Sequence, residues 1–120
     1  MGLTQFTGNE GEKFAEEYLK KMGYKTLERN FKKPFGEIDL IMKKGKNIVF
    51  VEVKTRSSLY AGTPAEAVKI PQQRRIKRIA EYYLLTSGKK LLPRFDVVEI
   101  YLEKGTLLLK EINHIENAFC

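Results

Sequence analysis

The amino-acid sequence predicts one α/β domain in which a mixed central β-sheet is flanked by helices. Three observations carry this prediction: an amphipathic helical segment near the start, a second one in the second half, and apolar strand-like segments between and after them. The resulting order is helix, three strands, helix, two strands, which favours an α/β sandwich. Because 120 residues suffice for one compact domain and are short for two, we assign residues 1–120 to a single domain.

The first helix is predicted over residues 9–22. Asn9 can cap its start, and Gly23 can end it. Apolar residues recur at helical spacing while charged residues occupy the other faces, so one side of this helix should pack on the sheet. The apolar residues are Phe14, Ala15, Tyr18, Leu19 and Met22.

Three strands are predicted next, over residues 24–31, 37–42 and 47–54. Pro34 and Gly36 separate the first of them from the second. The third reads NIVFVEVK and is apolar on both faces, which is typical of a central strand that is covered on both sides.

The second half of the chain continues the alternation of helix and strand. After an irregular polar stretch, in which Pro64 can open a short helical turn, the spacing of apolar residues predicts a helix over residues 71–86. A strand over residues 94–103 follows, and Gly105 turns it into a hairpin partner over residues 106–112.

The composition bounds the function. Lysine and arginine number 22 against 15 aspartate and glutamate residues, and the formal net charge is +7, which favours a polyanion such as nucleic acid or an anionic membrane surface as the partner. One cysteine, Cys120, allows no intrachain disulfide, which fits the cytoplasm. The start of the chain has no apolar signal-peptide core, and no apolar run reaches membrane-spanning length, so we expect no membrane insertion.

Three charged residues, Asp39, Glu52 and Lys54, stand within or beside apolar strand segments. Charges are costly to bury, so in such places they usually hold something. If the Lys44–Gly45 pair is a two-residue hairpin loop, Asp39 falls opposite Phe50 and shares a face with Glu52 and Lys54. The two carboxylates would then be diagonal neighbours, roughly 7 Å apart at Cβ. A one-residue bulge would place Asp39 on the other face.

This pattern suits metal-assisted cleavage of a phosphodiester. A cation held by Asp39 and Glu52 would polarise the phosphate and activate a bound water, while Lys54 would steady that water or the developing charge. The sequence holds one histidine and one cysteine, so a metal should have oxygen ligands, which favours Mg²⁺ or Mn²⁺. The alternative is a surface ion pair of Glu52 and Lys54 at the sheet margin, which would not need Asp39.

Several blocks of the sequence occur in an order that is shared with a known family. The most specific are GEIDLI and FVEVKTR, and the others are Gly11-Glu12, Ala15, Tyr18-Leu19, Arg29-Asn30 and RFDVV. Together they resemble the small bacterial YraN-type family of predicted endonucleases over nearly the whole chain. That family is similar in turn to the archaeal Holliday-junction resolvases and the PD-(D/E)xK, restriction-endonuclease-like superfamily.

The resemblance implies a restriction-endonuclease-like core with a Mg²⁺-dependent phosphodiesterase site. It makes Asp39 and Glu52 metal ligands and Lys54 the catalytic lysine, with the carbonyl of Val53 as a further ligand. Glu12 matches the glutamate that resolvase-like members add to the site, although a glutamate in the first turn also favours the helix dipole.

The start of the second helix is basic, with five lysine or arginine residues and no acid between residues 69 and 78. Such a helix would contact phosphates regardless of sequence, and the alternative is a solvated helix face. Thr55 and Arg56 directly follow the candidate site and could hold a phosphate. Gln72 stands where related sequences should carry a lysine. The expected nucleic-acid contacts are Arg56, Thr55, Lys69, Arg74, Arg75 and Arg78.

The sequence therefore predicts a Mg²⁺- or Mn²⁺-dependent, resolvase-like endonuclease that acts on DNA, including branched DNA. Two alternatives stay open: a nucleic-acid-binding module with the nuclease fold and little catalysis, and an interaction protein whose basic face meets an acidic partner. Symmetric cleavage of two strands needs two sites, so it would require a homodimer. Arg94 and Asp96 are expected to pair structurally, and His114 is expected to lack a partner.

Overall fold

The computed structural model describes residues 3–57 and 68–119, with side chains from residue 10 onward. The element order is helix, three strands, helix and two strands, as the sequence predicted. The predicted turn at Pro64 lies outside the described residues. The elements are α1 (Leu3–Lys21), β1 (Lys25–Lys33), β2 (Gly36–Lys44), β3 (Asn47–Ser57), α2 (Ile70–Ser87), β4 (Leu92–Leu102) and β5 (Leu109–Phe119).

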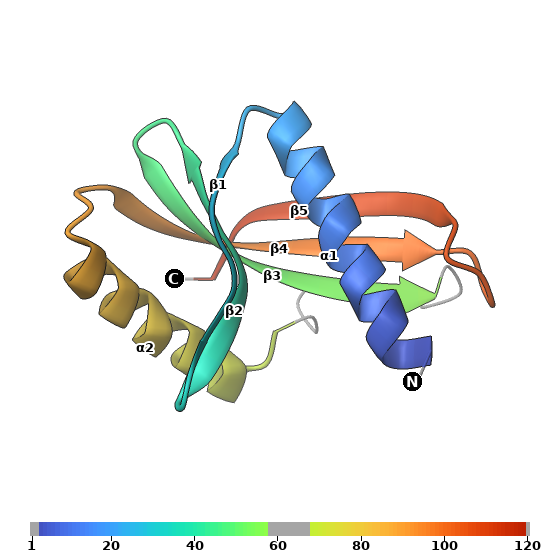
Figure 1. Cartoon of the computed structure of the whole chain (residues 1–120), viewed down its shortest axis with the longest axis horizontal. Coiled ribbons are helices and arrows are strands. Elements are labelled where there is room, and N and C mark those ends of the chain that lie inside the picture. Colours follow the sequence, from blue (N-terminus) through green and yellow to red (C-terminus); the bar gives the residue numbers. More distant parts are fainter. Residues whose placement is uncertain (1–2, 58–67, 120) are drawn as a thin grey trace.

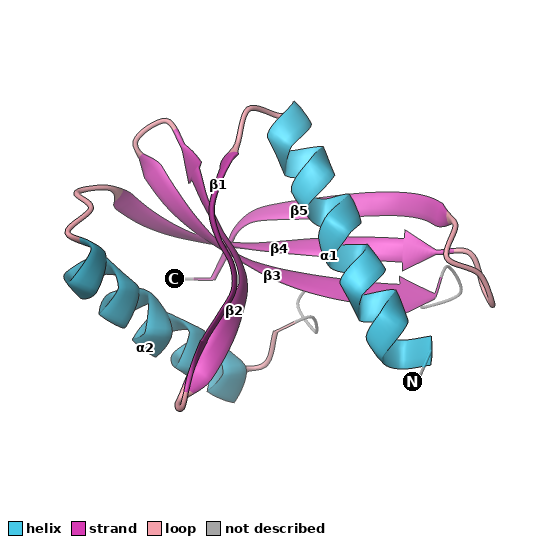
Figure 2. Ribbon diagram, viewed as in Figure 1, coloured by secondary structure: helices cyan, strands magenta, loops and turns pink. Residues whose placement is uncertain are grey.

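The five strands form one mixed sheet in the order β1-β2-β3-β4-β5. Strands β3 and β4 are parallel, since α2 returns the chain between them, and the other neighbours are antiparallel. Helix α1 crosses β3 and β4, whereas α2 lies along β2 (Figures 1 and 2). The predicted α/β sandwich is thereby confirmed, and its architecture is consistent with a restriction-endonuclease-like core. Neither helix in the described part of the chain is long and apolar enough to cross a membrane.

The two faces of the sheet carry separate apolar cores, one under each helix. The central strand β3 contributes residues to both cores, because alternate residues of a strand point to opposite faces. The α1-side core is built around Ala15, Leu19, Leu40, Val49, Val51, Val98 and Ile100. The α2-side core is built around Ile38, Ile41, Ile48, Phe50, Ile76, Ile79 and Tyr83.

The hairpin between β2 and β3 differs from the predicted register by two residues. Lys44 pairs with Asn47, so the loop consists of Gly45 and Lys46, whereas the sequence predicted a loop of Lys44 and Gly45. A shift of two residues leaves every side chain on its predicted face, because the strand period is two. It changes the neighbour of Asp39, however, since continuing this register by one pair brings Asp39 opposite Glu52 and not Phe50.

Strand β1 changes face at Asn30, which has a φ of 48°. Arg29, before it, donates from Nε to Oε1 of Glu16 on α1 at 2.8 Å. Phe31, after it, packs against Tyr83 of α2 with ring centroids 5.1 Å apart. Residues two apart in a regular strand share a face, so the left-handed backbone of Asn30 produces the change.

The partner strand β2 changes face at the same level. Leu40 belongs to the α1-side core and pairs with Arg29, while Ile38 belongs to the α2-side core and pairs with Phe31. Asp39 lies between them. Asp39 therefore lies at the point where β1 and β2 cross from the α1 side of the sheet to the α2 side.

Helix α1 approaches β3 closely at Gly11. A Cβ atom at this position would lie 1.9 Å from Oγ1 and 3.1 Å from Cβ of Thr55. The glycine is therefore required by packing, although glycine lowers intrinsic helix stability by about 1 kcal/mol relative to alanine. This contact fixes the distance between β3 and the turn of α1 that carries Glu12.

We expect Gly11→Ala to lower the free energy of unfolding by about 1–3 kcal/mol, because overpacking outweighs the gain in helix propensity. Urea denaturation measures the change. Thr55→Ala should recover part of the loss in the double variant, because it removes the Oγ1 atom that the new methyl group meets. Stabilisation by Gly11→Ala alone would contradict the close approach.

Candidate functional site

The site is built where β2 and β3 separate. Their pairing runs from Lys44–Asn47 to Leu40–Val51. Beyond Val51, a backbone N–H of β3 bonds to the side chain of Asp39 and not to a backbone carbonyl of β2. The backbone N–H of Val53 donates to Oδ2 of Asp39 at 2.8 Å. A strand residue directs its N–H and C=O to the same neighbour, so the carbonyl of Val53 faces the same gap. The structure thereby brings Val53 and Asp39 together as predicted.

The Glu52 carboxyl group is buried next to that of Asp39, and Glu52 is only 8% exposed. Its pKa is raised to about 9 by burial and by hydrogen bonding to and the negative charge of Asp39, and Lys54 offsets part of the rise. Two carboxyl groups in such contact need a proton or a cation between them.

Glu12 interacts electrostatically with Asp39 and Glu37 from the opposite layer. Burial raises its pKa to about 7, with further contributions from the charges of Asp39 and Glu37, while a hydrogen bond from Asn30 opposes the rise. Helix α1 covers one face of the sheet and Glu52 points to the other, so Glu12 and Glu52 approach Asp39 from different sides of the gap. The sequence placed Glu12 in this site only through family resemblance.

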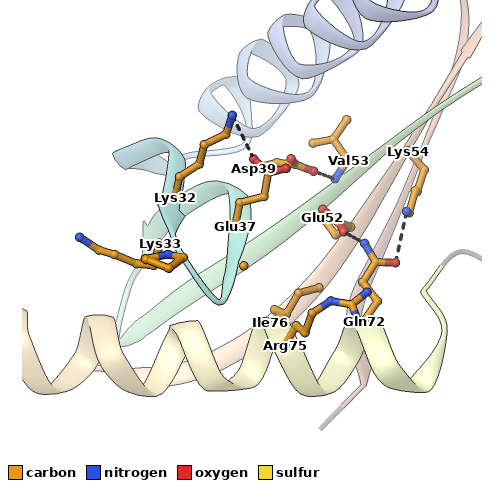
Figure 3. Close-up of a pocket in the computed structure, with 12 residues that line it drawn as sticks. Lys32, Lys33, Glu37, Asp39, Glu52, Val53, Lys54, Gln72, Arg75 and Ile76 are labelled. Atoms are coloured by element: carbon orange, nitrogen blue, oxygen red, sulfur yellow. Dashed lines mark hydrogen bonds and ion pairs between the residues drawn. The ribbon is translucent and has the colours of Figure 1, made fainter.

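Gln72, at the start of α2, connects Glu52 with Lys54 (Figure 3). Its Nε2 donates to Oε2 of Glu52, and its Oε1 accepts from Nζ of Lys54 at 3.4 Å. An ammonium can only donate, so Lys54 takes the amide oxygen of Gln72 and leaves the amide nitrogen to face Glu52. The sequence identified this position as one where a lysine was expected, and glutamine serves both charged neighbours at once.

These residues line a cavity of about 570 Å³ between the β1–β2 hairpin and α2, with β3 as its floor (Figure 3). Its carboxylates are flanked by basic side chains from three elements. The lining residues are Lys32, Lys33, Pro34, Gly36, Glu37, Asp39, Glu52, Val53, Lys54, Gln72, Arg75 and Ile76.

The donor set fits a hard divalent cation. Asp39 and Glu52 offer carboxylate oxygens and Val53 a carbonyl oxygen, which are the ligands that Mg²⁺ and Mn²⁺ prefer. Among the described residues, no three acid, histidine or cysteine side chains converge closely enough to hold a metal by themselves. Mg²⁺ commonly keeps several waters and uses one or two carboxylates, so a two-carboxylate site suffices for it.

The predicted nucleic-acid contacts lie in different surroundings. Arg75 lines the cavity, whereas Lys69, directly before α2, and Arg74, in its first turns, are exposed. Arg78 lies over the ring of Phe35, 5.1 Å from its centroid.

Two further predicted contacts are engaged within the protein. Thr55 lies on the α1 side of β3 against Gly11, and so it is on the other face from the cavity. Arg56 shares the face of Lys54 and pairs through Nε with Oε2 of the buried Glu99 at 3.2 Å. Their roles as phosphate contacts stay predictions.

A second polar cluster lies on the α1 side of β4 and corrects the expectation for His114. Its Nε2 is 2.7 Å from Oδ2 of Asp96, so the histidine has a partner. Asp96 also accepts two hydrogen bonds from Arg94, which confirms the expected structural pair. Burial raises the pKa of Asp96, but hydrogen bonds from His114 and Arg94 outweigh it and hold the pKa below its usual range.

Residues 11–100 of the chain match the model of a family described as "Uncharacterised protein family UPF0102". A UPF0102 protein of Caldanaerobacter subterraneus is 52% identical over 113 residues, which cover 93% of each chain. One of Caldicellulosiruptor bescii is 48% identical over 121 residues and covers 99% of this chain and 100% of its own. One of Clostridioides difficile is 45% identical over 113 residues, covering 93% and 95%.

The raised pKa of Glu52 gives a pH-dependent prediction. The folded state holds the Glu52 proton up to about pH 9, whereas the unfolded chain releases it near 4.5, so its contribution to stability falls as pH rises between these values. Glu52→Gln should therefore become more stable relative to the wild type from pH 5 to pH 9, by at most about 1.4 kcal/mol per pH unit.

Urea denaturation in EDTA at pH 5, 7 and 9 would measure this difference. Glu37→Gln, which removes an exposed carboxylate from the same cavity, is the matched control. A stability difference between Glu52→Gln and the wild type that is the same at all three pH values would contradict the assignment.

Proposed function

This chain belongs to the UPF0102 family, and we propose that it is a Mg²⁺- or Mn²⁺-dependent endonuclease that hydrolyses phosphodiesters in DNA, including branched DNA. The observation that carries the proposal is the pair of Asp39 and Glu52 carboxyl groups at one gap in the sheet, with Lys54 beside them and with Glu12 of α1 acting on Asp39 from the other side. Structural ion pairs rarely place acids so that their charges oppose one another, whereas functional sites do.

In the proposed reaction, Asp39, Glu52 and the carbonyl of Val53 would hold the cation, and Glu12 would support it from the α1 side. The cation, when bound, supplies charge neutralisation at the phosphate and a more acidic water. Lys54 donates from Nζ on the cavity side of β3, so its ammonium can face the phosphate oxygens on which charge develops. Arg75 lies across the cavity as a second cation for the substrate.

The remaining residues of the site set positions. Gln72 holds the Glu52 carboxylate and the Lys54 ammonium at a fixed spacing, so we regard it as a positioning residue. Cleavage of both strands of a duplex would need two copies of the chain, since each copy offers one such site.

Asp39→Ala, Glu52→Ala and Lys54→Ala should each reduce DNA cleavage by roughly 10²–10⁴-fold, because each removes a group that stabilises the transition state. Nicking of supercoiled plasmid and cutting of a four-way junction in Mn²⁺ would measure it. Glu37→Gln should retain activity as the control from the same cavity. Equal activity in all variants would overturn the site, and binding of DNA without cleavage by the wild type would favour the non-catalytic binding module.

Gln72→Ala should lower kcat about tenfold and leave KM nearly unchanged, because the amide contacts Glu52 and Lys54 and acts through them. Steady-state kinetics on a labelled DNA substrate would separate the two constants. An increase in KM with an unchanged kcat would instead indicate that Gln72 binds substrate directly.

A further inference from the structure

The cavity has a second basic wall, which the sequence did not indicate. Lys32 and Lys33 end β1 and line the cavity opposite α2. The Lys32 side chain is 73% exposed and lies 3.8 Å from Oε2 of Glu37. This wall faces the α2 residue Arg75 across the carboxylates, so cations border the acids from both sides (Figure 3).

Contacts between the β1–β2 hairpin and α2 hold the second basic wall, here called the hairpin wall, in place. The ring centroids of Phe35 and Tyr82 are 5.8 Å apart, and the Arg78 guanidinium lies 5.1 Å from the Phe35 centroid. Gly36 faces Ile79 so closely that a Cβ atom would lie 2.8 Å from Cδ1 of that residue. The turn between β1 and β2 therefore packs on α2 and does not extend freely into solvent.

Aromatic rings also position Lys33 itself. Its Nζ lies 5.1 Å from the centroid of Phe31 and 5.2 Å from that of Tyr82. An ammonium at this distance over two ring faces is attracted by both, which reduces the freedom of an otherwise flexible side chain. The two rings thus hold the Lys33 ammonium outside the acidic centre, on the side of the cavity away from Glu52 (Figure 3).

We propose that the hairpin tip, defined here as Lys32 and Lys33, binds the phosphate backbone of nucleic acid next to the phosphodiester at the acidic centre. The inference rests on the proposed function and deepens it by giving the substrate a second contact surface. A nucleic-acid chain carries one charge per nucleotide, so neighbouring phosphates can contact the hairpin wall and the α2 wall at the same time.

The competing explanation is general attraction by a protein of net charge +7, to which any surface lysine contributes. The chain offers a matched control for this. Lys25 and Lys43 are exposed and paired at the other end of the same two strands. Lys32→Glu/Lys33→Glu and Lys25→Glu/Lys43→Glu change the net charge equally on the same ribbon.

Fluorescence anisotropy with a labelled 30-nucleotide single strand and its duplex, in EDTA and across a salt series, would measure binding without cleavage. We expect the Lys32/Lys33 variant to weaken binding at least tenfold and to reduce the slope of log K against log salt by about 1–2, since each lost phosphate contact removes about 0.7–0.9. The Lys25/Lys43 variant should change affinity less than threefold. Equal weakening by the two variants, or none, would overturn the proposal.

Two arms separate this result from folding and from the proposed reaction. Lys32→Ala/Lys33→Ala removes the contacts without adding acids, and it should still unfold in one cooperative urea transition while its DNA affinity falls. The same binding series in an Asp39→Ala background tests the hairpin when cleavage is absent. Absence of cleavage by the wild type together with hairpin-dependent binding would count against the nuclease alone, and cleavage by the wild type with hairpin-independent binding would count against this inference alone.

Discussion

The separation of β2 from β3 after the Leu40–Val51 pair is the constraint on which the site depends. A strand that leaves its neighbour exposes backbone groups that must find other partners, and the N–H of Val53 finds the Asp39 carboxylate. This bond holds Asp39 in the plane of the sheet, where residues from either face can reach it. Glu52 does so from the α2 side and Glu12 from the α1 side. A continuous ladder would keep these two acids in separate layers.

The electrostatics of the cavity follow from that geometry. Burial and the charge of Asp39 raise the pKa of Glu12 and of Glu52, which makes the metal-free arrangement costly when these glutamates are ionised. The same charges are what a divalent cation would neutralise. Lys54 and the Gln72 amide relieve part of the cost from the floor and from α2. The close carboxyl groups of Asp39 and Glu52 thus lower the stability of the metal-free protein, but they form a negative centre that basic side chains surround. This arrangement suits a phosphate that lies between a metal ion and an ammonium group.

The sequence predicted the element order and the common side of Glu52 and Lys54 on their strand, because both depend on local periodicity. It missed the loop by one residue, which shifts the strand register by two and brings Asp39 opposite Glu52. Gln72 and Lys33 could not be placed in the cavity from the sequence, since their positions follow from how α2 and the hairpin pack. The partner of His114 was missed for the same reason: Asp96 is on the neighbouring strand, 18 residues away.

Strand β1 links the two halves of the site through Asn30. Glu16 accepts from both Thr26 and Arg29 of this strand, which fixes α1 against it. Glu12 is one turn earlier on the same side of the helix and therefore falls beside Asn30, whose side chain bonds to it. The left-handed backbone of Asn30 then sends the following residues toward α2, where the strand ends in the basic hairpin. The left-handed conformation of Asn30 thus places Glu12 on one side of the edge strand β1 and directs the strand's terminal lysines, Lys32 and Lys33, to the other side.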